Sequence, residues 1–180
     1  EANDPDSVEG TLLFNQKFVD AVRATGGNNA VRNLIVMPYA GSGVKGRLET
    51  FTLPKDSAED HLILEIHNYD PEGFCWYHAP WTVVRDSWGD KDDYAQIKAL
   101  QKELKETKEK WGVPAIVGEF GSQDKQNEAA RALHAGEFVK AMKEIGVKCF
   151  WWECGKFSVM DREKCTVRFP MIIKALTDQR

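Results

Sequence analysis

The sequence predicts an α/β fold built on a parallel sheet of four strands. Segments in which apolar residues recur at helical spacing alternate with short apolar runs, and each run leads into a polar or aromatic loop. Short strands that are apolar on both faces are typical of parallel sheets covered by helices. Such sheets carry functional groups on the loops that follow the carboxyl ends of their strands.

The first half of the chain is predicted to hold one helix and two strands. The helix begins near Asp6 and Ser7, which suit an N-cap, and ends at the glycines of residues 25–27. Its apolar positions are Leu12, Leu13, Phe14, Phe18, Val19 and Val22. Residues 33–37 and 61–66 are short apolar runs closed by turn signals, and both are predicted to be strands.

The second half continues the alternation. In order, the predictions are helix 93–111, strand 113–118, helix 128–145, strand 147–152 and helix 168–177. Pro170 falls in the first turn of the last helix, where proline is tolerated. At 180 residues the chain is expected to form one domain, residues 1–180.

Composition excludes several classes of protein. The net charge is −4 with basic residues scattered among acids, which argues against nucleic-acid binding. No apolar run is long enough to span a membrane, and the first residues carry no export signal, so we expect a soluble chain. The glycines at 41, 43 and 46 fit neither a phosphate loop nor a dinucleotide fingerprint. The histidines are dispersed, so no metal and no cofactor is expected.

The four cysteines lack metal-type spacing. They are Cys75, Cys149, Cys154 and Cys165. Buried or incidental thiols are the favoured interpretation, and a disulfide between Cys154 and Cys165 is the alternative.

Aromatic and hydrogen-bonding side chains gather after the second predicted strand. His67 and Tyr69 occupy alternate positions, so both can lean to the same side of the sheet. A histidine in such a position, taken alone, is more often structural than functional, so both interpretations of His67 stay open. The loop that follows holds Phe74, Trp76, Tyr77 and Trp81. These rings suit either a stacking surface or a folded aromatic lid without a ligand.

The third and fourth predicted strands end in acidic and aromatic residues. Glu119 terminates a wholly apolar run, and glutamate is rarely buried unpaired, so it is expected to be functional or to form a salt bridge. Trp151 and Trp152 point to opposite faces of their strand, and Glu153 follows. One of the two rings could serve as a sugar platform, or both could belong to the core.

Taken together, these motifs resemble glycoside hydrolase family 5, the cellulase family of retaining β/α-barrel glycosidases. The resemblance rests on the segments 67–69, 81, 88–89, 113–121, 150–153 and 160–162. It implies half of a TIM (β/α)8 barrel, with residues 32–39 as strand five and the later strands as six to eight. A complete barrel needs about 250 residues, more than this chain offers.

The resemblance also implies roles for individual residues. Glu119 matches the catalytic nucleophile, and His67 and Tyr69 match the pair that holds the substrate and orients that nucleophile. Trp152 matches the platform under the sugar at the cleavage site, while Trp81 and Trp76 would line further subsites. A retaining mechanism needs a second carboxylate about 5 to 5.5 Å away as acid and base. The family's Asn-Glu-Pro motif for that carboxylate is absent from this sequence.

Three explanations of the missing acid stay open: an inactive fragment, one piece of a split enzyme, or a homodimer. An open four-stranded sheet leaves two bare edges, which favours a dimer, and the partner's Glu153 could then supply the acid. The expected function is hydrolysis of a β-glucan polysaccharide such as cellulose, with Glu119 as nucleophile. The alternative is an inactive half-barrel that only binds polysaccharide. The family also implies a secreted, extracellular location.

Overall fold

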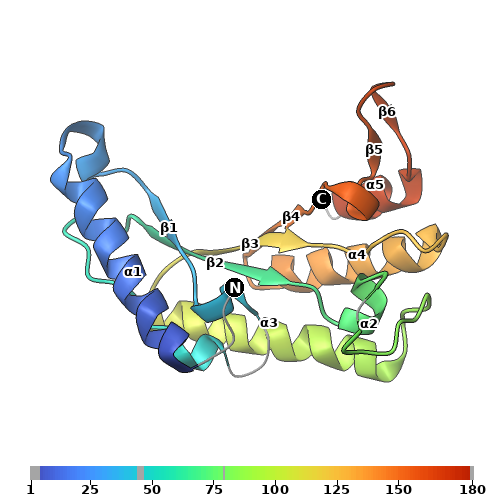
Figure 1. Cartoon of the computed structure of the whole chain (residues 1–180), viewed down its shortest axis with the longest axis horizontal. Helices are drawn as coiled ribbons and strands as arrows, with labels where there is room; N and C mark the ends of the chain where they lie inside the picture. The colour runs from blue at the N-terminus through green and yellow to red at the C-terminus, as the bar shows by residue number, and fades with distance from the viewer. Residues whose placement is uncertain (1–4, 44–46, 79, 179–180) are drawn as a thin grey trace.

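The computed structural model describes residues 5–43, 47–78 and 80–178, and Figure 1 shows their arrangement. The helices are α1 (Pro5–Ala24), α2 (Glu72–Cys75), α3 (Lys91–Trp111), α4 (Glu128–Glu144) and α5 (Pro170–Thr177). The strands are β1 (Leu34–Val36), β2 (Leu62–Asn68), β3 (Ala115–Phe120), β4 (Lys148–Trp151), β5 (Met160–Asp161) and β6 (Thr166–Val167). None of the helices described is long and apolar enough to cross a membrane.

The first four strands form one sheet in the order β1-β2-β3-β4, and every neighbouring pair is parallel. This confirms the predicted sheet and places the carboxyl ends of all four strands at one edge. Each strand lies within a residue or two of its predicted position, and the third continues through Glu119 to Phe120. The sheet therefore brings the polar and aromatic strand ends of the sequence to a common side of the molecule.

Helix α3 shows why the predicted helices form where they do. The Asp90 side chain accepts hydrogen bonds from the backbone amides of Asp92 and Asp93, and the Asp93 side chain accepts one from the Asp90 backbone amide. This reciprocal capping satisfies amides that the first helical turn leaves without partners. The helix ends at Gly112, whose left-handed conformation (φ 65°) suits glycine.

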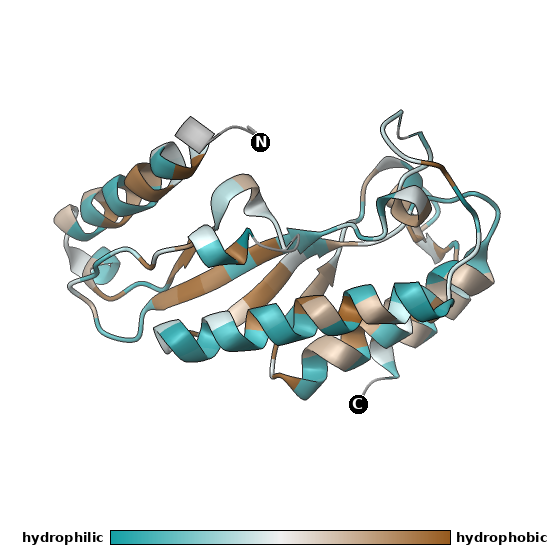
Figure 2. Ribbon diagram, turned by 90° about the horizontal axis from the view of Figure 1, so that it is seen from below, coloured by the Kyte–Doolittle hydropathy of each residue, from teal (hydrophilic) through white to brown (hydrophobic). Residues whose placement is uncertain are grey.

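The core lies between the sheet and helices α3 and α4. Alternate strand residues and the facing sides of these helices supply its fully buried members, which include Leu64, Ile66, Leu104, Val117, Phe138 and Met142. Figure 2 shows the strands as mainly hydrophobic, whereas α3 presents a largely hydrophilic surface outside them. Helix α3 thus packs Ile97, Leu100 and Leu104 inward and turns a charged surface outward.

The opposite face of the sheet, which is the interior of the predicted half-barrel, is partly open. Ile35 on β1 is 43% exposed and Phe150 on β4 is 55% exposed. Ile63, Glu65 and Ile116 on the same face are only half-buried. The residues are apolar on both faces as predicted, but within the described residues only one face is packed against helices.

Helix α1 is likewise packed on only part of its apolar surface. Val19 is buried and Phe18 packs against the core, whereas Leu13 is 61% and Phe14 is 70% exposed. The helix has the predicted bounds within a residue or two. Its predicted apolar stripe is correct in sequence but is only partly covered.

Several features were not predicted from the sequence. Helix α2 and the antiparallel pair β5 and β6 lie in segments that carry no strong periodic signal. The four cysteines, by contrast, follow the favoured interpretation: all are free thiols, Cys75 buried and Cys154 and Cys165 exposed, and the alternative disulfide is not formed. Burial raises the pKa of the Cys149 thiol to about 12, as expected for an inert structural cysteine.

Candidate active site

A bulge in β3 sets the direction of Glu119. Ile66 pairs with Val117, but the next residue of β2, His67, pairs with Glu119, so Gly118 is an extra residue. A strict two-residue alternation would send Glu119 to the helix-covered face together with Val117. The bulge instead places Glu119 on the face of His67 and returns Phe120 to the core, where it is fully buried.

Two side chains from the end of β2 contact the Glu119 carboxylate. The Tyr69 hydroxyl donates a hydrogen bond of 2.8 Å to Glu119 Oε2. Nδ1 of His67 lies 3.4 Å from the same oxygen, at ion-pair distance. The structure thus brings together the three residues that the sequence singled out at two separate strand ends. A carboxylate held at one oxygen in this way has a fixed orientation.

Glu65 is a member of this cluster that the sequence reasoning missed. Its Oε1 lies 3.4 Å from Nε2 of His67, so the imidazole stands between two carboxylates. A Cβ atom on Gly118 would come within 1.6 Å of the same Glu65 oxygen, so a larger residue there would displace the Glu65 side chain. A signal was available: Glu65 is an acid inside an apolar run, two residues before His67 and therefore on its face.

The cluster opens into a cavity of about 440 Å³. Its walls are formed by Ala40, Ser42, Arg47, His67, Tyr69, Asp70, Glu72, Trp76, Trp81, Glu119 and Trp152. All six residues predicted to be catalytic or to bind substrate therefore line a single cavity: Glu119, His67, Tyr69, Trp152, Trp81 and Trp76. Burial raises the pKa of the Asp70 carboxyl above its usual range, and a hydrogen bond from Asn68 opposes this shift.

The two tryptophans at the end of β4, Trp151 and the following Trp152, point in different directions as predicted. Trp152 is 39% exposed and lines the cavity. Trp151 points away from it, contacts the Phe120 ring edge-on, and donates from its indole nitrogen to the Phe157 carbonyl at 2.9 Å. One ring is thus available as a platform, and the other is packed in the structure.

The aromatic loop after β2 combines the two interpretations left open by the sequence. Phe74 is fully buried and belongs to the core. Trp76 lies 5.0 Å from the Tyr69 ring and 5.4 Å from the Phe157 ring, measured between centroids. Trp81 is 65% exposed at the cavity. The loop is folded, but it keeps exposed aromatic surface beside Glu119.

Polar contacts join the three loops that follow β2, β3 and β4, which we call the rim loops. The backbone amide of Gln123 donates to the carbonyl of Cys75 at 2.8 Å, and that of Asp124 donates to the carbonyl of Lys156 at 2.9 Å. The loop after β3 is therefore bonded to the loops on either side of it. Lys125 adds a bond from its ammonium group to the Phe74 carbonyl.

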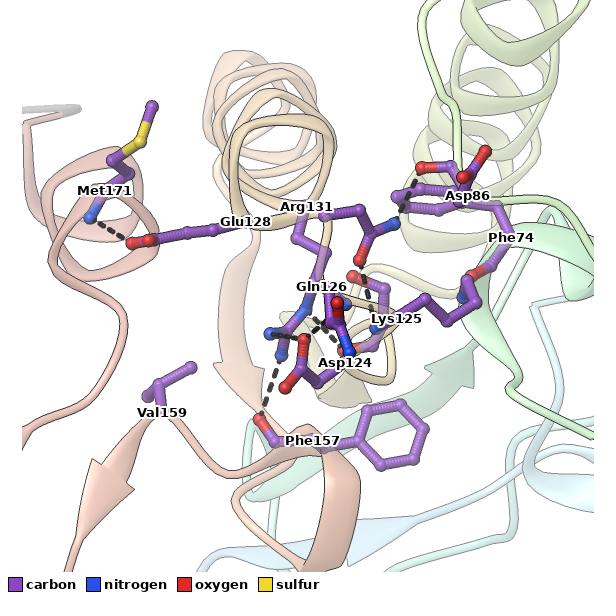
Figure 3. Close-up of polar contacts among 12 residues, drawn as sticks. Phe74, Asp86, Asp124, Lys125, Gln126, Glu128, Arg131, Phe157, Val159 and Met171 are labelled. Carbon is purple, nitrogen blue, oxygen red and sulfur yellow. Dashed lines mark hydrogen bonds and ion pairs between the residues drawn. The ribbon is translucent and has the colours of Figure 1, made fainter.

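Arg131 of α4 is the buried centre of these contacts, as Figure 3 shows. Its Nε donates to the Ser122 carbonyl at 3.0 Å, and Nη2 reaches the Phe157 carbonyl at 3.5 Å. Burial lowers the pKa of Arg131 to about 10, although Asp124, 3.8 Å away, opposes this shift. Arg131 thus fixes the backbone of Phe157, whose ring supports Tyr69 and Trp76.

Glu153 lies outside the set of residues that form the cavity wall. Its two oxygens accept backbone hydrogen bonds from Val159 at 2.8 Å and from Met160 at 3.2 Å. In this chain it therefore holds the segment that leads into β5. Its role as an acid supplied by a partner stays a prediction. Across residues 5–43, 47–78 and 80–178, no cluster of three or more His, Cys, Asp or Glu side chains is arranged to hold a metal.

The chain is similar to known cellulases over most of its length. Residues 2–158 match the family described as Cellulase (glycosyl hydrolase family 5). The chain is 31% identical over 170 residues to endoglucanase B of Neocallimastix patriciarum, which covers 91% of this chain and 34% of that protein. It is 32% identical over 163 residues to endoglucanase A of Ruminococcus albus, which covers 85% of this chain and 43% of that protein.

Solved structures give the same result. A mutant family 5 lichenase from a Caldicellulosiruptor species in complex with cellotetraose superposes with a TM-score of 0.87 at 31% identity, covering 99% of this chain and 52% of the lichenase chain. A broad-specificity endoglucanase from Clostridium longisporum has a TM-score of 0.87 at 27% identity and coverages of 98% and 52%. The chain thus spans about half the length of these structures. With four parallel strands that match half of such a barrel and a family match over most of its residues, the chain belongs to glycosyl hydrolase family 5.

Proposed function

We propose that this chain provides the nucleophile half of a retaining β-glucan hydrolase. The observation that carries the proposal is the Glu119 carboxylate, held by Tyr69 and His67 at a cavity walled by tryptophans. In a retaining mechanism such a carboxylate attacks the anomeric carbon and forms a glycosyl-enzyme intermediate. Tyr69 and His67 orient the attacking oxygen, which reduces the entropy lost on reaching the transition state.

The substrate class follows from the cavity walls. Trp152 and Trp81 are exposed, and Trp76 is partly exposed in the same lining. Flat aromatic surfaces of this kind suit the apolar faces of β-linked glucose rings. The similarity to a lichenase solved with cellotetraose supports a β-glucan as the substrate. A polymer of this kind is encountered outside the cell, so we also propose an extracellular location.

The acid and base of the reaction must come from a second carboxylate about 5 to 5.5 Å from Glu119. We propose that it comes from outside the 180 residues of this chain, because the sequence has no Asn-Glu-Pro motif. A homodimer joined at the open edges of β1 and β4 is one source, with Glu153 of the partner as the candidate acid. The bonds from Val159 and Met160 to Glu153 would then have to break or be shared.

The test of Glu119 uses an aryl cellobioside with a good leaving group. Such a substrate needs little protonation, so a nucleophile without its acid can release one equivalent of phenol in a burst. The wild-type chain and the control Glu163→Gln, an exposed site far along the chain, are expected to show the burst. Glu119→Gln is expected to show none. A burst that survives in Glu119→Gln would refute the assignment of the nucleophile.

A second candidate function is polysaccharide binding without cleavage. The exposed rings of Trp152 and Trp81 favour it, since both belong to this chain whereas the acid carboxylate does not. Carboxymethyl cellulose hydrolysis, measured together with the mass in solution by light scattering, separates the candidates. A dimer whose hydrolysis disappears in both Glu119→Gln and Glu153→Gln would support the partner-supplied acid. Binding of cellotetraose without a burst or hydrolysis would support the binding function.

A further inference from the structure

Trp81 is the most exposed aromatic ring at the cavity, and yet its edge is fixed. The side chain is 65% exposed and lines the cavity that contains Glu119. Its indole nitrogen donates a hydrogen bond of 2.7 Å to Oε2 of Glu72, the first residue of α2. Hydrogen bonds from a neutral donor to a carboxylate are shorter and stronger than those between neutral groups. The bond holds the indole by its polar edge and leaves its ring face exposed.

The backbone around Trp81 is held against the same helix. A Cβ atom on Gly73 would lie 2.3 Å from the Val83 carbonyl oxygen, so the glycine allows this loop to approach α2 closely. The Arg85 amide donates to the Gly73 carbonyl at 2.8 Å. The Arg85 guanidinium is in turn paired with the buried Asp93 at the start of α3. The segment that carries Trp81 is therefore anchored on both α2 and α3.

A fixed ring binds a ligand more tightly than a mobile one. An exposed tryptophan that moves freely loses rotamer entropy when a sugar stacks on it, and this loss opposes binding. An indole already held in place avoids most of that loss. The remaining requirement is that the hydrogen bond does not hide the ring, and the 65% exposure of Trp81 meets it.

From these contacts we propose that Glu72 is a positioning residue that holds Trp81 in one orientation as a sugar platform in the cavity wall. This inference rests on the proposed β-glucan function and adds to it a residue that sets affinity for longer oligosaccharides. The affinity of a short ligand that reaches only Trp152 would not depend on Glu72. The affinity of a ligand long enough to stack on Trp81 would depend on Glu72.

A double-mutant cycle tests the inference on the full chain. The variants are Glu72→Met, which removes the acceptor at similar volume, Trp81→Phe, which keeps a ring without the N–H, and the two combined. Cellotetraose affinity is measured by titration calorimetry. Glu72→Met is expected to weaken binding about threefold to tenfold, in keeping with the modest net value of one hydrogen bond. In the Trp81→Phe background the same change is expected to have no effect, because the bond is already gone.

A second readout follows the indole directly in the unliganded protein. The Trp81 indole N–H resonance is assigned by its absence in Trp81→Phe, and it is expected to shift upfield in Glu72→Met. Glu72→Gln, whose amide oxygen can still accept, is expected to restore part of the affinity and part of the shift. Glu163→Met serves as the control at an exposed glutamate and should change neither.

The outcomes separate this inference from the function on which it rests. A wild-type chain that does not bind cellotetraose would overturn both the platform and the glucan-binding function. Binding that is weakened by Glu72→Met to the same extent in both backgrounds would overturn the positioning role alone, because Glu72 would then act on the sugar itself. An unchanged affinity and an unchanged Trp81 resonance in Glu72→Met would also overturn it.

Discussion

Acidification from pH 7 to pH 4.5 is expected to destabilise the fold through His134. This histidine lies on α4 and is 1% exposed. Its ring contacts Phe74 at 5.5 Å and Trp88 at 5.4 Å, measured between ring centroids. Burial lowers the pKa of His134 to about 4, while Asp93 and the backbone of Asp70 oppose the shift. A charged imidazole is therefore costly at this position.

The magnitude follows from the difference between the folded and unfolded states. The pKa of histidine is about 6.5 in an unfolded chain, so that state binds the extra proton first as the pH falls. Stability is fully present above pH 6.5 and is lost progressively as the pH falls toward the folded value of about 4. Between pH 7 and pH 4.5 the expected loss is about 2 to 3 kcal/mol.

The assay is urea unfolding at a series of pH values, with His134→Gln and His134→Phe as partners for the wild type. Neither replacement titrates, so the free energy of unfolding should fall less with decreasing pH in both variants than in the wild type. Because glutamine and phenylalanine differ in polarity, an equal effect in both identifies the lost titration as the cause. The window stops at pH 4.5 because Asp56 contributes a second pH-dependent loss of stability below it. The native pKa of Asp56 is lowered, chiefly by its hydrogen bonds with Arg23, so the unfolded state takes up that proton first. Wild-type and variant curves that stay parallel over this window would refute the reasoning.

Three further perturbations test other parts of the structure. Gly118→Ala puts a methyl group within 1.6 Å of the Glu65 carboxylate, so we expect a loss of about 1 to 3 kcal/mol in urea unfolding. Glu65→Ala added to it should restore most of that loss, and a failure to do so would show that the clash lies elsewhere. Arg131→Met removes the hydrogen bonds to the carbonyls of Ser122 and Phe157, so the free energy of unfolding should fall by about 1 to 3 kcal/mol. Cellotetraose binding should also weaken, because Phe157 supports Tyr69 and Trp76. An unchanged affinity in titration calorimetry would contradict that supporting role. Asp90→Ala removes the cap of α3 and should lower the free energy of unfolding by about 1 kcal/mol with no effect on the aryl cellobioside burst.

The elements and their order could be predicted from the sequence because their signals are local. Apolar spacing and glycine stops located the long helices, and short apolar runs located the strands of the main sheet. The family resemblance then joined Glu119, His67 and Tyr69, which the structure places within hydrogen-bond or ion-pair distance. No comparison tests their catalytic roles, which stay predictions.

What could not be predicted depends on contacts between distant segments. The bulge at Gly118 appears only when β3 is paired with β2, and counting by twos along β3 alone gives Glu119 the wrong face. Glu65 lies within an apolar run of the sequence, and its contact with His67 becomes evident only in the folded structure. The exposure of Leu13 and Phe14 could not be predicted either. Apolar spacing shows that a helix has an apolar side, but it does not show which segment covers that side.

The bonds between the rim loops bear on how the cavity can change during evolution. The amides of Gln123 and Asp124 bond to the carbonyls of Cys75 and Lys156, and all four groups are main-chain atoms. Main-chain bonds survive the exchange of the side chains attached to them. Residues on the two flanking loops can therefore be replaced one at a time while the frame beneath them is kept. Relatives with different side chains on these loops can in this way keep the same main-chain frame beside Glu119.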